Sequence, residues 1–279
     1  MRDAPEPAEL MEVATRAVEA GAEVALGRFG DPRLNPEEKA APDDLVSEAD
    51  RDAERAIRSV IAAARPDDEI LGEELGVVDG SSSVRWLVDP IDGTTSYLYG
   101  RGDWAVSAAA ASKRGELILA GAVAEPVHDT VTSACLGGGA WSSGDRLRCS
   151  MQADLSNALV ELNFGVPLQR KLAGSVVAAL LPEIRDLRRS GSAAAALAKV
   201  ASGRADAYWG PGLAPWDAAA GLLLAREAGA ETGDLAGPRA GLPSSGDVLA
   251  ANAALWPQLR ALISTVWVTP SSPSGESSG

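Results

Sequence analysis

The chain has 279 residues, enough for one large domain or for one fold built from two halves around a substantial core. It carries 25 Lys plus Arg and 39 Asp plus Glu, a formal net charge of −14, which argues against the clustered cations of a nucleic-acid or polybasic membrane surface. One histidine and two cysteines exclude a histidine-based zinc cage, a disulfide framework and a CxxC metal site.

The N-terminal residues and the cysteines indicate where the protein works. The opening sequence MRDAPEPAEL is acidic and lacks an apolar stretch, so it is not a secretory signal. No uncharged apolar run approaches the roughly 20 residues that a membrane span requires. With two scattered cysteines, Cys135 and Cys149, these features predict a cytoplasmic protein with no membrane or nucleic-acid partner.

The first part of the chain is predicted to form helices and then strands. Apolar residues at helical spacing predict helices over residues 7–29 and 47–64, separated by a proline-punctuated loop at 30–46. A short apolar run flanked by loops follows at 66–83. The pattern then changes to strands, which we expect at residues 84–89, 104–111, 117–124 and 130–135, with KRGE (113–116) as a hairpin link.

The second part alternates between strands and helices, which favours an α/β half behind an α+β half. We expect halves at residues 1–150 and 151–268, followed by a disordered tail at 269–279 that has no apolar anchor. The predicted strands of the second half lie at 158–164, 185–190, 205–210 and 248–252, and its predicted helices at 168–184, 192–202, 215–230 and 252–263.

The densest chemical signal is VDPIDGTT at residues 88–95. A strand ends in Asp89, Pro90 interrupts the ladder, and Asp92 follows three residues after Asp89. Two carboxylates on one tight turn, with the carbonyl of Ile91 between them, can converge on hard divalent cations, which prefer oxygen ligands. Backbone N–H groups after the glycine can form an anion-binding concavity beside them. The alternative is a plain surface turn, because Asp, Pro, Gly and Thr are all turn residues.

Three further acids give weaker signals. Glu73 comes shortly after the apolar stretch that lies within residues 66–83, and the alternative is a solvated loop acid. Asp50 closes SEAD, which also has the form of a helix N-cap box. Asp217 opens a predicted helix in the sequence PWD, where an acid is ordinary helix-start chemistry. Each acid alone therefore has a structural explanation.

The order and spacing of these pieces together resemble the inositol monophosphatase family, the magnesium-dependent, lithium-sensitive phosphatases related to fructose-bisphosphatase. WLVDPIDGTTSYLYG (86–100) and PWDAAAGLLLAREAGA (215–230) carry the resemblance, which extends from the first predicted helix to the last. It implies a layered αβαβα sandwich with the active site between the halves, two or three bound Mg²⁺ ions, and a homodimer.

The resemblance also implies residue roles. Glu73, Asp89 and the Ile91 carbonyl would bind one Mg²⁺, Asp89, Asp92 and Asp217 a second, and Glu73 would help to hold a third. Asp50 and Thr94 would orient and deprotonate the attacking water, and Glu73 belongs to the same catalytic group. The implied substrate-binding residues are Glu73, Ile91, Asp92, Gly93, Thr94, Gly191, Ser192, Ala193 and Asp217. The resemblance thus implies that the half at 1–150 carries most of the metal ligands and that the half at 151–268 carries Asp217 and substrate contacts.

The sequence departs from the family pattern at Gly210. Members that prefer inositol phosphate carry an acid seven positions before the Trp-Asp aspartate, where it accepts hydrogen bonds from ring hydroxyls. Gly210 occupies that position here and offers no side-chain acceptor. Ser96 and Tyr97 replace the commoner Asn-Phe, beyond the metal ligands. The pattern therefore indicates intact phosphatase chemistry and leaves the alcohol specificity open.

We expect a Mg²⁺-dependent phosphomonoesterase that hydrolyses a small polyol or sugar phosphate, with inositol 1-phosphate as the first candidate. Histidinol phosphate and fructose 1,6-bisphosphate are alternatives within the family. An alternative of another class is a catalytically silent ligand-binding or regulatory protein on the same fold. Acids that converge without a metal repel one another, so we also expect raised carboxyl pKa values.

Overall fold

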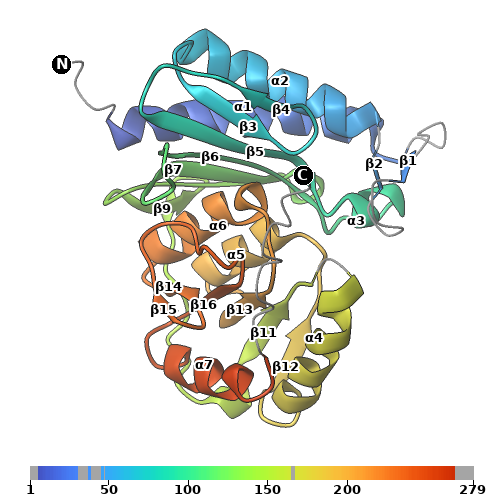
Figure 1. Cartoon of the computed structure of the whole chain (residues 1–279), viewed down its shortest axis with the longest axis vertical. Coiled ribbons are helices and arrows are strands. Elements are labelled where there is room, and N and C mark those ends of the chain that lie inside the picture. The colour runs from blue at the N-terminus through green and yellow to red at the C-terminus, as the bar shows by residue number, and fades with distance from the viewer. Residues whose placement is uncertain (1–5, 31–36, 39–44, 47, 165–166, 268–279) are drawn as a thin grey trace, which may run out of the picture.

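The structure is a computed structural model that describes residues 6–30, 37–38, 45–46, 48–164 and 167–267. Figure 1 shows alternating layers of helices and sheets: α1 and α2, an eight-stranded sheet, α5 and α6, a six-stranded sheet, and then α4 and α7. The predicted αβαβα sandwich is confirmed. Of the helices in the described ranges, none combines the length and the apolar character that crossing a bilayer requires.

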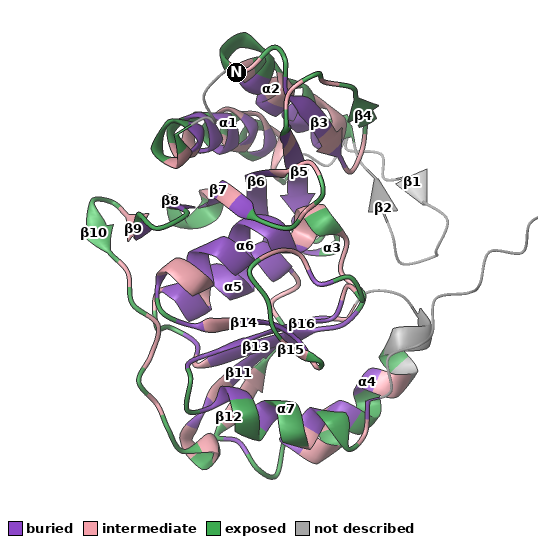
Figure 2. Cartoon of the chain, turned by 60° about the vertical axis from the view of Figure 1, so that its left-hand side comes forward, coloured by how far each residue is buried: buried purple, intermediate pink, exposed green. Residues whose placement is uncertain are grey.

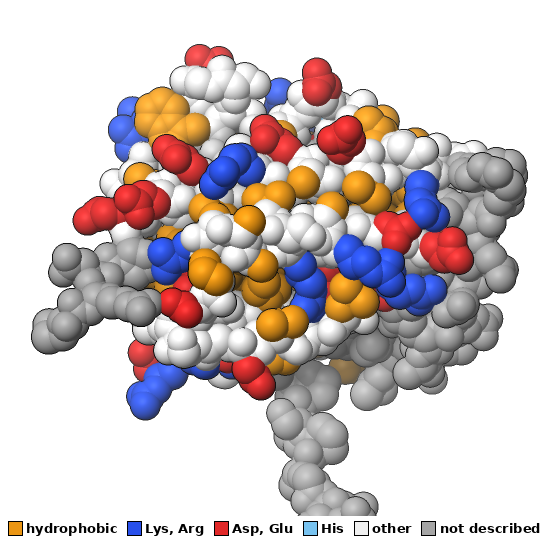
Figure 3. Space-filling view, turned by 90° about the horizontal axis from the view of Figure 1, so that it is seen from above, with side chains coloured by type: hydrophobic (Ala, Val, Ile, Leu, Met, Phe, Trp, Pro, Cys, Tyr) orange, Lys and Arg blue, Asp and Glu red, His pale blue; other side chains and the backbone are white. Residues whose placement is uncertain are grey.

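The outer helical layer consists of α1 (Pro7–Arg28) and α2 (Glu48–Ala64), as predicted. The two helices approach closely because Gly21 has no side chain: a Cβ there would lie 2.6 Å from Cγ1 of Ile57. Figure 3 looks onto this layer and shows acidic and basic side chains interspersed, without a large region of one sign. Within the predicted loop 30–46, β1 (Glu37–Glu38) and β2 (Leu45–Val46) pair with each other.

The eight-stranded sheet has the order β10-β9-β8-β7-β6-β5-β3-β4, and only β3 and β5 pair in parallel. The KRGE hairpin is confirmed between β6 and β7, whereas β4, β9 and β10 were not predicted. These last three strands have two to four residues each, too few to show a period. The strands are β3 (Glu69–Gly72), β4 (Gly76–Val78), β5 (Val84–Asp92), β6 (Ala105–Ser112), β7 (Ile118–Glu125), β8 (Thr130–Cys135), β9 (Gly139–Ser142) and β10 (Asp145–Arg146).

The acid motif does not form the predicted tight turn. Strand β5 continues through Pro90 to Asp92 and pairs with β6 on both sides of an irregular step between Asp89 and Asp92. Such a bulge leaves a residue unpaired, so a proline without an N–H is tolerated there. Both acids therefore lie at the end of a buried strand.

The six-stranded sheet has the order β12-β11-β13-β16-β14-β15. The four predicted strands and four predicted helices are present; β14 and β15 were missed, and α4 ends at Leu180, shortly before Pro182. The division into halves stays a prediction, and the tail at 269–279 lies outside the described residues. The elements are β11 (Leu159–Leu162), α4 (Pro167–Leu180), β12 (Asp186–Arg188), α5 (Ala193–Ala201), β13 (Ala207–Gly210), α6 (Pro215–Glu227), β14 (Glu231–Asp234), β15 (Gly237–Pro238), β16 (Val248–Ala251) and α7 (Trp256–Ser264), with 3₁₀ turns at Pro126–His128 and Leu155–Asn157.

The central helices α5 and α6 are packed between the sheets through very small side chains. Figure 2 shows this layer buried. A Cβ on Gly121 of β7 would lie 3.0 Å from Cα of Ala220, and a Cβ on Gly221 would lie 2.5 Å from Cβ of Leu197. The helices and the first sheet are thus in near-backbone contact, which fixes the start of each helix relative to the end of β5.

Candidate active site

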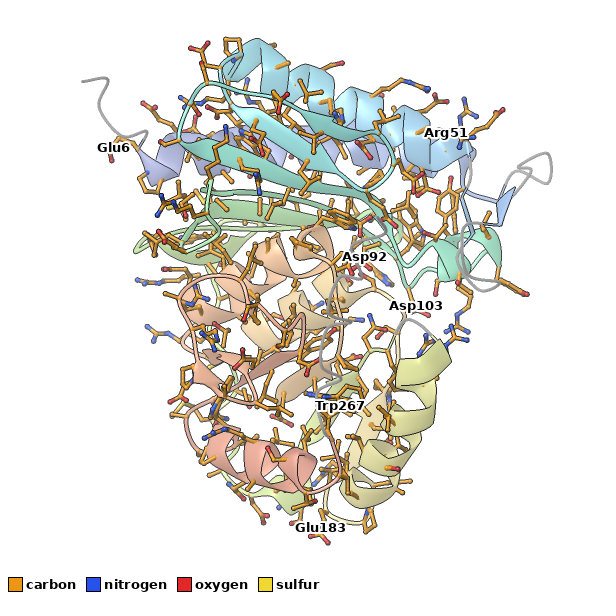
Figure 4. All side chains as sticks on the ribbon, in the orientation of Figure 1. Glu6, Arg51, Asp92, Asp103, Glu183 and Trp267 are labelled. Atoms are coloured by element: carbon orange, nitrogen blue, oxygen red, sulfur yellow. The ribbon has the colours of Figure 1, made fainter. Side chains whose placement is uncertain are left out.

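Strand β5 brings the acid motif to the boundary between the eight-stranded sheet and the α5/α6 layer, where Figure 4 shows Asp92. Gly93 follows in the left-handed conformation with φ +95° and leads into the short helix α3 (Thr94–Leu98). A Cβ on Gly93 would lie 3.0 Å from the carbonyl oxygen of Asp103 and 3.4 Å from the amide nitrogen of Ser192. A glycine is therefore needed both for the turn and for the close approach of the 190s segment.

The Gly191–Ala193 segment meets the acid motif directly. The Ser192 hydroxyl donates to Asp92 Oδ2 at 2.7 Å, and the Ala194 amide donates to the same oxygen at 2.6 Å. Ser192 also caps α5, because its hydroxyl accepts from the Ala195 amide at 3.0 Å. The predicted alcohol-contacting segment is thereby joined to a predicted metal ligand from the other sheet.

The residues around Asp89 are held by short backbone contacts. The Glu73 amide donates to the Val88 carbonyl at 3.1 Å, which places the turn after β3 beside β5. Asp89 Oδ1 accepts from the Ile91 amide at 3.1 Å, and the Thr94 hydroxyl donates to the Ile91 carbonyl at 3.1 Å. The predicted ligand carbonyl and the predicted water-activating hydroxyl are therefore neighbours.

Asp217 is both a helix-start acid and a neighbour of the other acids of the predicted site. It is the third residue of α6, and its Oδ2 accepts from the Ala214 amide at 2.9 Å, as a helix-start acid does. The carboxyl group also lies within hydrogen-bonding range of the Asp89 carboxyl, a contact that opposes the rise of the Asp217 pKa. The start of α6 thus brings a second-half acid to the end of β5.

The predicted acids act on one another electrostatically. Burial raises the pKa of Asp89 most, and the charges of Glu73, Asp92, Asp217 and Asp50 raise it further, in that order. Asp89 and Asp50 are each 1% exposed, so little water screens these charges. Each of the other acids singled out from the sequence therefore lies close enough to Asp89 for its charge to raise the Asp89 pKa.

The pKa values of the neighbouring acids shift in the same direction. Burial raises the pKa of Asp92 to about 7, against the opposing hydrogen bonds from Ala194 and Ser192. Burial, then the charges of Asp92 and Glu73, raise the pKa of Asp217 well above its ordinary value. The expected rise in carboxyl pKa is found for Asp89, Asp92 and Asp217, with burial a larger cause than the repulsion that the sequence suggested.

The donor set has the chemistry of a hard-cation site. It contains carboxylate oxygens and a backbone carbonyl, and a divalent cation would reverse the repulsion that raises the pKa values. Within the described residues, no three histidine, cysteine or acidic side chains are grouped closely enough to hold a metal ion as they stand. Asp92 Oδ2 accepts from Ser192 and Asp217 Oδ2 accepts from the Ala214 amide, so each of these hydrogen bonds uses one carboxylate oxygen and the second oxygen can still face a cation.

Tyr208, which the sequence analysis missed, fills the space beside Gly210. A Cβ on residue 210 would lie 2.3 Å from the Tyr208 hydroxyl oxygen. The hydroxyl is buried beside Asn163 and makes no hydrogen bond of ordinary geometry with the described residues. Burial, followed by the charges of Asp92 and Asp217, raises the pKa of Tyr208, so this group stays neutral. The i, i+2 spacing of Tyr208 and Gly210 on one strand was the available signal.

Comparison with known proteins agrees with this architecture. The sequence model of the inositol monophosphatase family matches residues 6–269. An inositol-1-monophosphatase from Mycobacterium bovis is 42% identical over 255 residues, which cover 85% of this chain and 87% of that protein. One from Rhizobium meliloti is 38% identical over 260 residues, covering 91% and 96%. A Xylella fastidiosa protein named Nus factor SuhB is 40% identical over 197 residues, covering 70% of each chain.

Solved structures show the same fold. The extragenic suppressor protein suhB from Bartonella henselae superimposes with a TM-score of 0.85 at 32% identity, covering 91% of this chain and 98% of that one. An IMPase from Thermotoga maritima superimposes with a TM-score of 0.83 at 27% identity, covering 92% and 98%. On the sequence match across residues 6–269, the chain belongs to the inositol monophosphatase family.

Proposed function

We propose that the protein is a Mg²⁺-dependent phosphomonoesterase that hydrolyses a small polyol or sugar phosphate, with inositol 1-phosphate as the first candidate. The observation that carries the proposal is the convergence of the charges of Glu73, Asp92, Asp217 and Asp50 on buried Asp89. A phosphate monoester is doubly charged, so its hydrolysis depends mainly on positioning and charge neutralisation. A cluster of acids that fits hard cations supports that chemistry.

The proposed metal ligands are Glu73, Asp89, the Ile91 carbonyl, Asp92 and Asp217, holding two or three Mg²⁺ ions. The family is Mg²⁺-dependent in general. When bound, the ions supply positive charge, lower the pKa of a coordinated water and stabilise the leaving alkoxide.

The side chains around the ions orient the reacting groups. Asp50 and Thr94, with Glu73, hold the attacking water and accept its proton, and Asp50 is buried with 1% of its surface exposed. The contact between the Thr94 hydroxyl and the Ile91 carbonyl keeps Thr94 beside the ligand set. Backbone N–H groups of Gly93 and Thr94 donate to the phosphate.

The alcohol part of the substrate is proposed to lie against Gly191, Ser192 and Ala193. Because Gly210 offers no acceptor and the neighbouring Tyr208 hydroxyl is buried, ring hydroxyls would be recognised differently from the family members with an acid there. Histidinol phosphate and fructose 1,6-bisphosphate are therefore kept as alternative substrates.

A regulatory role is the second candidate. Relatives from Xylella fastidiosa and Vibrio cholerae are named Nus factor SuhB, and they are 40% and 36% identical to this chain. A catalytically silent protein would retain this fold but release no phosphate, so substitution of a site residue would change no reaction rate. We favour the enzyme because each predicted metal and water-activating position carries a competent residue.

We also propose a cytoplasmic homodimer whose partner is the small phosphorylated substrate rather than nucleic acid or membrane. Light scattering coupled to size-exclusion chromatography tests the dimer, which should have twice the chain mass of 28.6 kDa. If the protein is a monomer at micromolar concentration, the homodimer proposal is wrong, and the proposed reaction is not affected by that result.

The deciding experiment measures Mg²⁺-dependent phosphate release from inositol 1-phosphate, histidinol phosphate, fructose 1,6-bisphosphate and 3′-phosphoadenosine 5′-phosphate. The matched blank is Asp92→Asn, which removes one proposed ligand charge at nearly constant volume. Turnover that is abolished both by EDTA and by the substitution supports the enzyme, and the best substrate shows what Gly210 permits. Wild type and variant that are equally silent on every compound favour the regulatory candidate.

A further inference from the structure

Asp247 is a buried carboxylate that the proposed reaction does not use. It is 2% exposed and precedes β16. Its Oδ1 accepts from the Gly212 amide at 3.1 Å, and its Oδ2 accepts from the Trp267 indole N–H at 2.9 Å. One side chain thus joins the β13–α6 loop, the start of β16 and the segment after α7.

Gly246, the residue before Asp247, holds the β13–α6 loop through a second hydrogen bond. The Leu213 amide donates to the Gly246 carbonyl at 2.8 Å. Gly246 has a φ of +72°, and a Cβ there would lie 2.9 Å from the Leu213 carbonyl oxygen. Two consecutive amides of the β13–α6 loop are therefore held by the two residues that directly precede β16.

The next amide along this loop belongs to the active site. Gly212 bonds to Asp247, Leu213 bonds to Gly246, and Ala214 donates to Asp217 Oδ2 at 2.9 Å. Because the three amides are consecutive, the position of the Ala214 N–H depends on where the first two are held. Asp247 thereby acts on the orientation of Asp217 without touching it.

Trp267, which donates to Asp247, also packs against β13. It is 3% exposed, and its ring stands edge-on to Trp209, with centroids 5.0 Å apart. Trp209 directly precedes Gly210 in β13, so the stack keeps water from the Asp247 carboxylate and braces the strand before the loop. Figure 4 shows Trp267 well separated from Asp92, so its effect on the site is indirect.

We propose that Asp247 is a positioning residue for Asp217, acting through the Gly212–Ala214 loop, and that Trp267 completes the support. The proposal rests on the proposed function for its kinetic readout and on Asp217 as a metal ligand for its binding readout. Groups that orient a ligand from outside typically change metal affinity or activity by 10- to 100-fold when altered. Asp247 acts one step further out, so we expect about tenfold.

The test is Mg²⁺ binding to Asp247→Asn and Trp267→Phe, measured by calorimetry and by the Mg²⁺ dependence of the melting temperature. Asn presents an N–H₂ group to one of the two donors, so one contact is lost. We expect the Mg²⁺ concentration for half-saturation to rise about tenfold in Asp247→Asn and less in Trp267→Phe, which keeps the ring. In kinetics, kcat falls while KM for the substrate changes little, because the phosphate and alcohol contacts are untouched.

Asp68 provides a control for the loss of a buried tryptophan–aspartate pair. Its Oδ2 accepts from the Trp86 indole N–H at 3.0 Å, it is 3% exposed, and it lies away from the β13–α6 loop, although it also pairs with Arg65 and accepts from Ser82. We expect Asp68→Asn to lower the melting temperature in EDTA, as Asp247→Asn does, and to leave the Mg²⁺ midpoint unchanged.

A Mg²⁺ midpoint of Asp247→Asn equal to that of Asp68→Asn overturns the proposal and leaves Asp247 a purely structural residue. If Asp247→Asn does not fold, Trp267→Phe decides, and a wild-type midpoint there overturns the proposal. If the protein binds Mg²⁺ but has no phosphatase activity, the proposed function is refuted, and the Mg²⁺ midpoints of the variants still test the role of Asp247. A wild type that binds no Mg²⁺ would overturn both.

Discussion

The hydroxyl of Tyr208 occupies the place where a side chain on Gly210 would begin, because a Cβ on residue 210 would lie 2.3 Å from the tyrosine oxygen and 2.9 Å from Cζ. A side chain at 210 and the present position of Tyr208 are therefore mutually exclusive. An acid cannot be placed at residue 210 by one substitution without displacing a fully buried aromatic ring.

The first prediction concerns this pair. Gly210→Glu should destabilise the fold by about 1–3 kcal/mol through overpacking, and Tyr208→Phe by less than about 1 kcal/mol because its hydroxyl has no regular partner. The double variant should be more stable than the sum of the single effects, since the oxygen that collides is gone. Urea unfolding of the four proteins measures the coupling. Strict additivity would show that the two positions do not compete.

The second prediction concerns the pH dependence of stability without metal. The pKa of Asp92 is about 7 in the folded protein against an ordinary 3.8, so the native state holds more protons than the unfolded chain between these values. Stability therefore falls as pH rises from about 4 to 7, by on the order of 4 kcal/mol from Asp92 alone. The raised pKa values of Asp89 and Asp217 act in the same direction.

Urea unfolding in EDTA at several pH values tests this slope. Asp92→Asn removes one titrating group and should flatten the curve while leaving a residual slope from Asp89 and Asp217. A metal-free wild type that becomes more stable between pH 5 and 7 would contradict the electrostatic description of the site.

The third prediction concerns metal and charge at Asp89. Asparagine is neutral without binding a proton, so Asp89→Asn avoids the stability cost that the raised pKa of Asp89 imposes at pH above its ordinary value and should melt above wild type in EDTA. In Mg²⁺ the order should reverse, since a ligand at 100 times its dissociation constant adds about 2.7 kcal/mol to the form that binds it. Melting curves of both proteins with EDTA and with millimolar Mg²⁺ give the comparison. An unchanged order in the two buffers would count against Asp89 as a ligand.

The fourth prediction concerns Thr94. Thr94→Val keeps the shape but removes the hydroxyl that contacts the Ile91 carbonyl, so kcat should fall by about 100-fold or more if the hydroxyl relays a proton. Thr94→Ser keeps the hydroxyl and should retain most of the rate. Single-turnover phosphate release compares the two, with melting temperatures to confirm that both fold. Equal rates for Val and Ser would remove Thr94 from the proton path.

The sequence predicted those features whose signal is local and repeated. The apolar face of α1 contains enough residues to define a helical period, and β8 is a short segment bounded by turn residues; both elements were predicted to within one residue. The site acids were identified because the motif order resembled a family, while each acid alone also fitted a turn or a cap. Asp217 does both, because a helix-start carboxylate can face a site and an amide together.

The features that could not be predicted depend on partners distant in the chain. Pro90 looked like the end of β5 because a proline interrupts a ladder, yet a bulge needs no donor at that residue. Strand β14 has the sequence ETGD, which is a strand only because β16 lies beside it. Asp247 carries no local signal, since its donors are Gly212 and Trp267.

The alanine-rich layer between the sheets has a consequence for how this protein can evolve. Where Gly121 meets Ala220 and Gly221 meets Leu197, the chain leaves no slack for a longer side chain. Substitution there can proceed only among the smallest residues, whereas the outer layers, packed by leucine, isoleucine and tryptophan, can exchange one shape for another. New substrate specificity would therefore arise from changes in the loops around the acidic residues, because the helices beneath them tolerate only small changes in side-chain size.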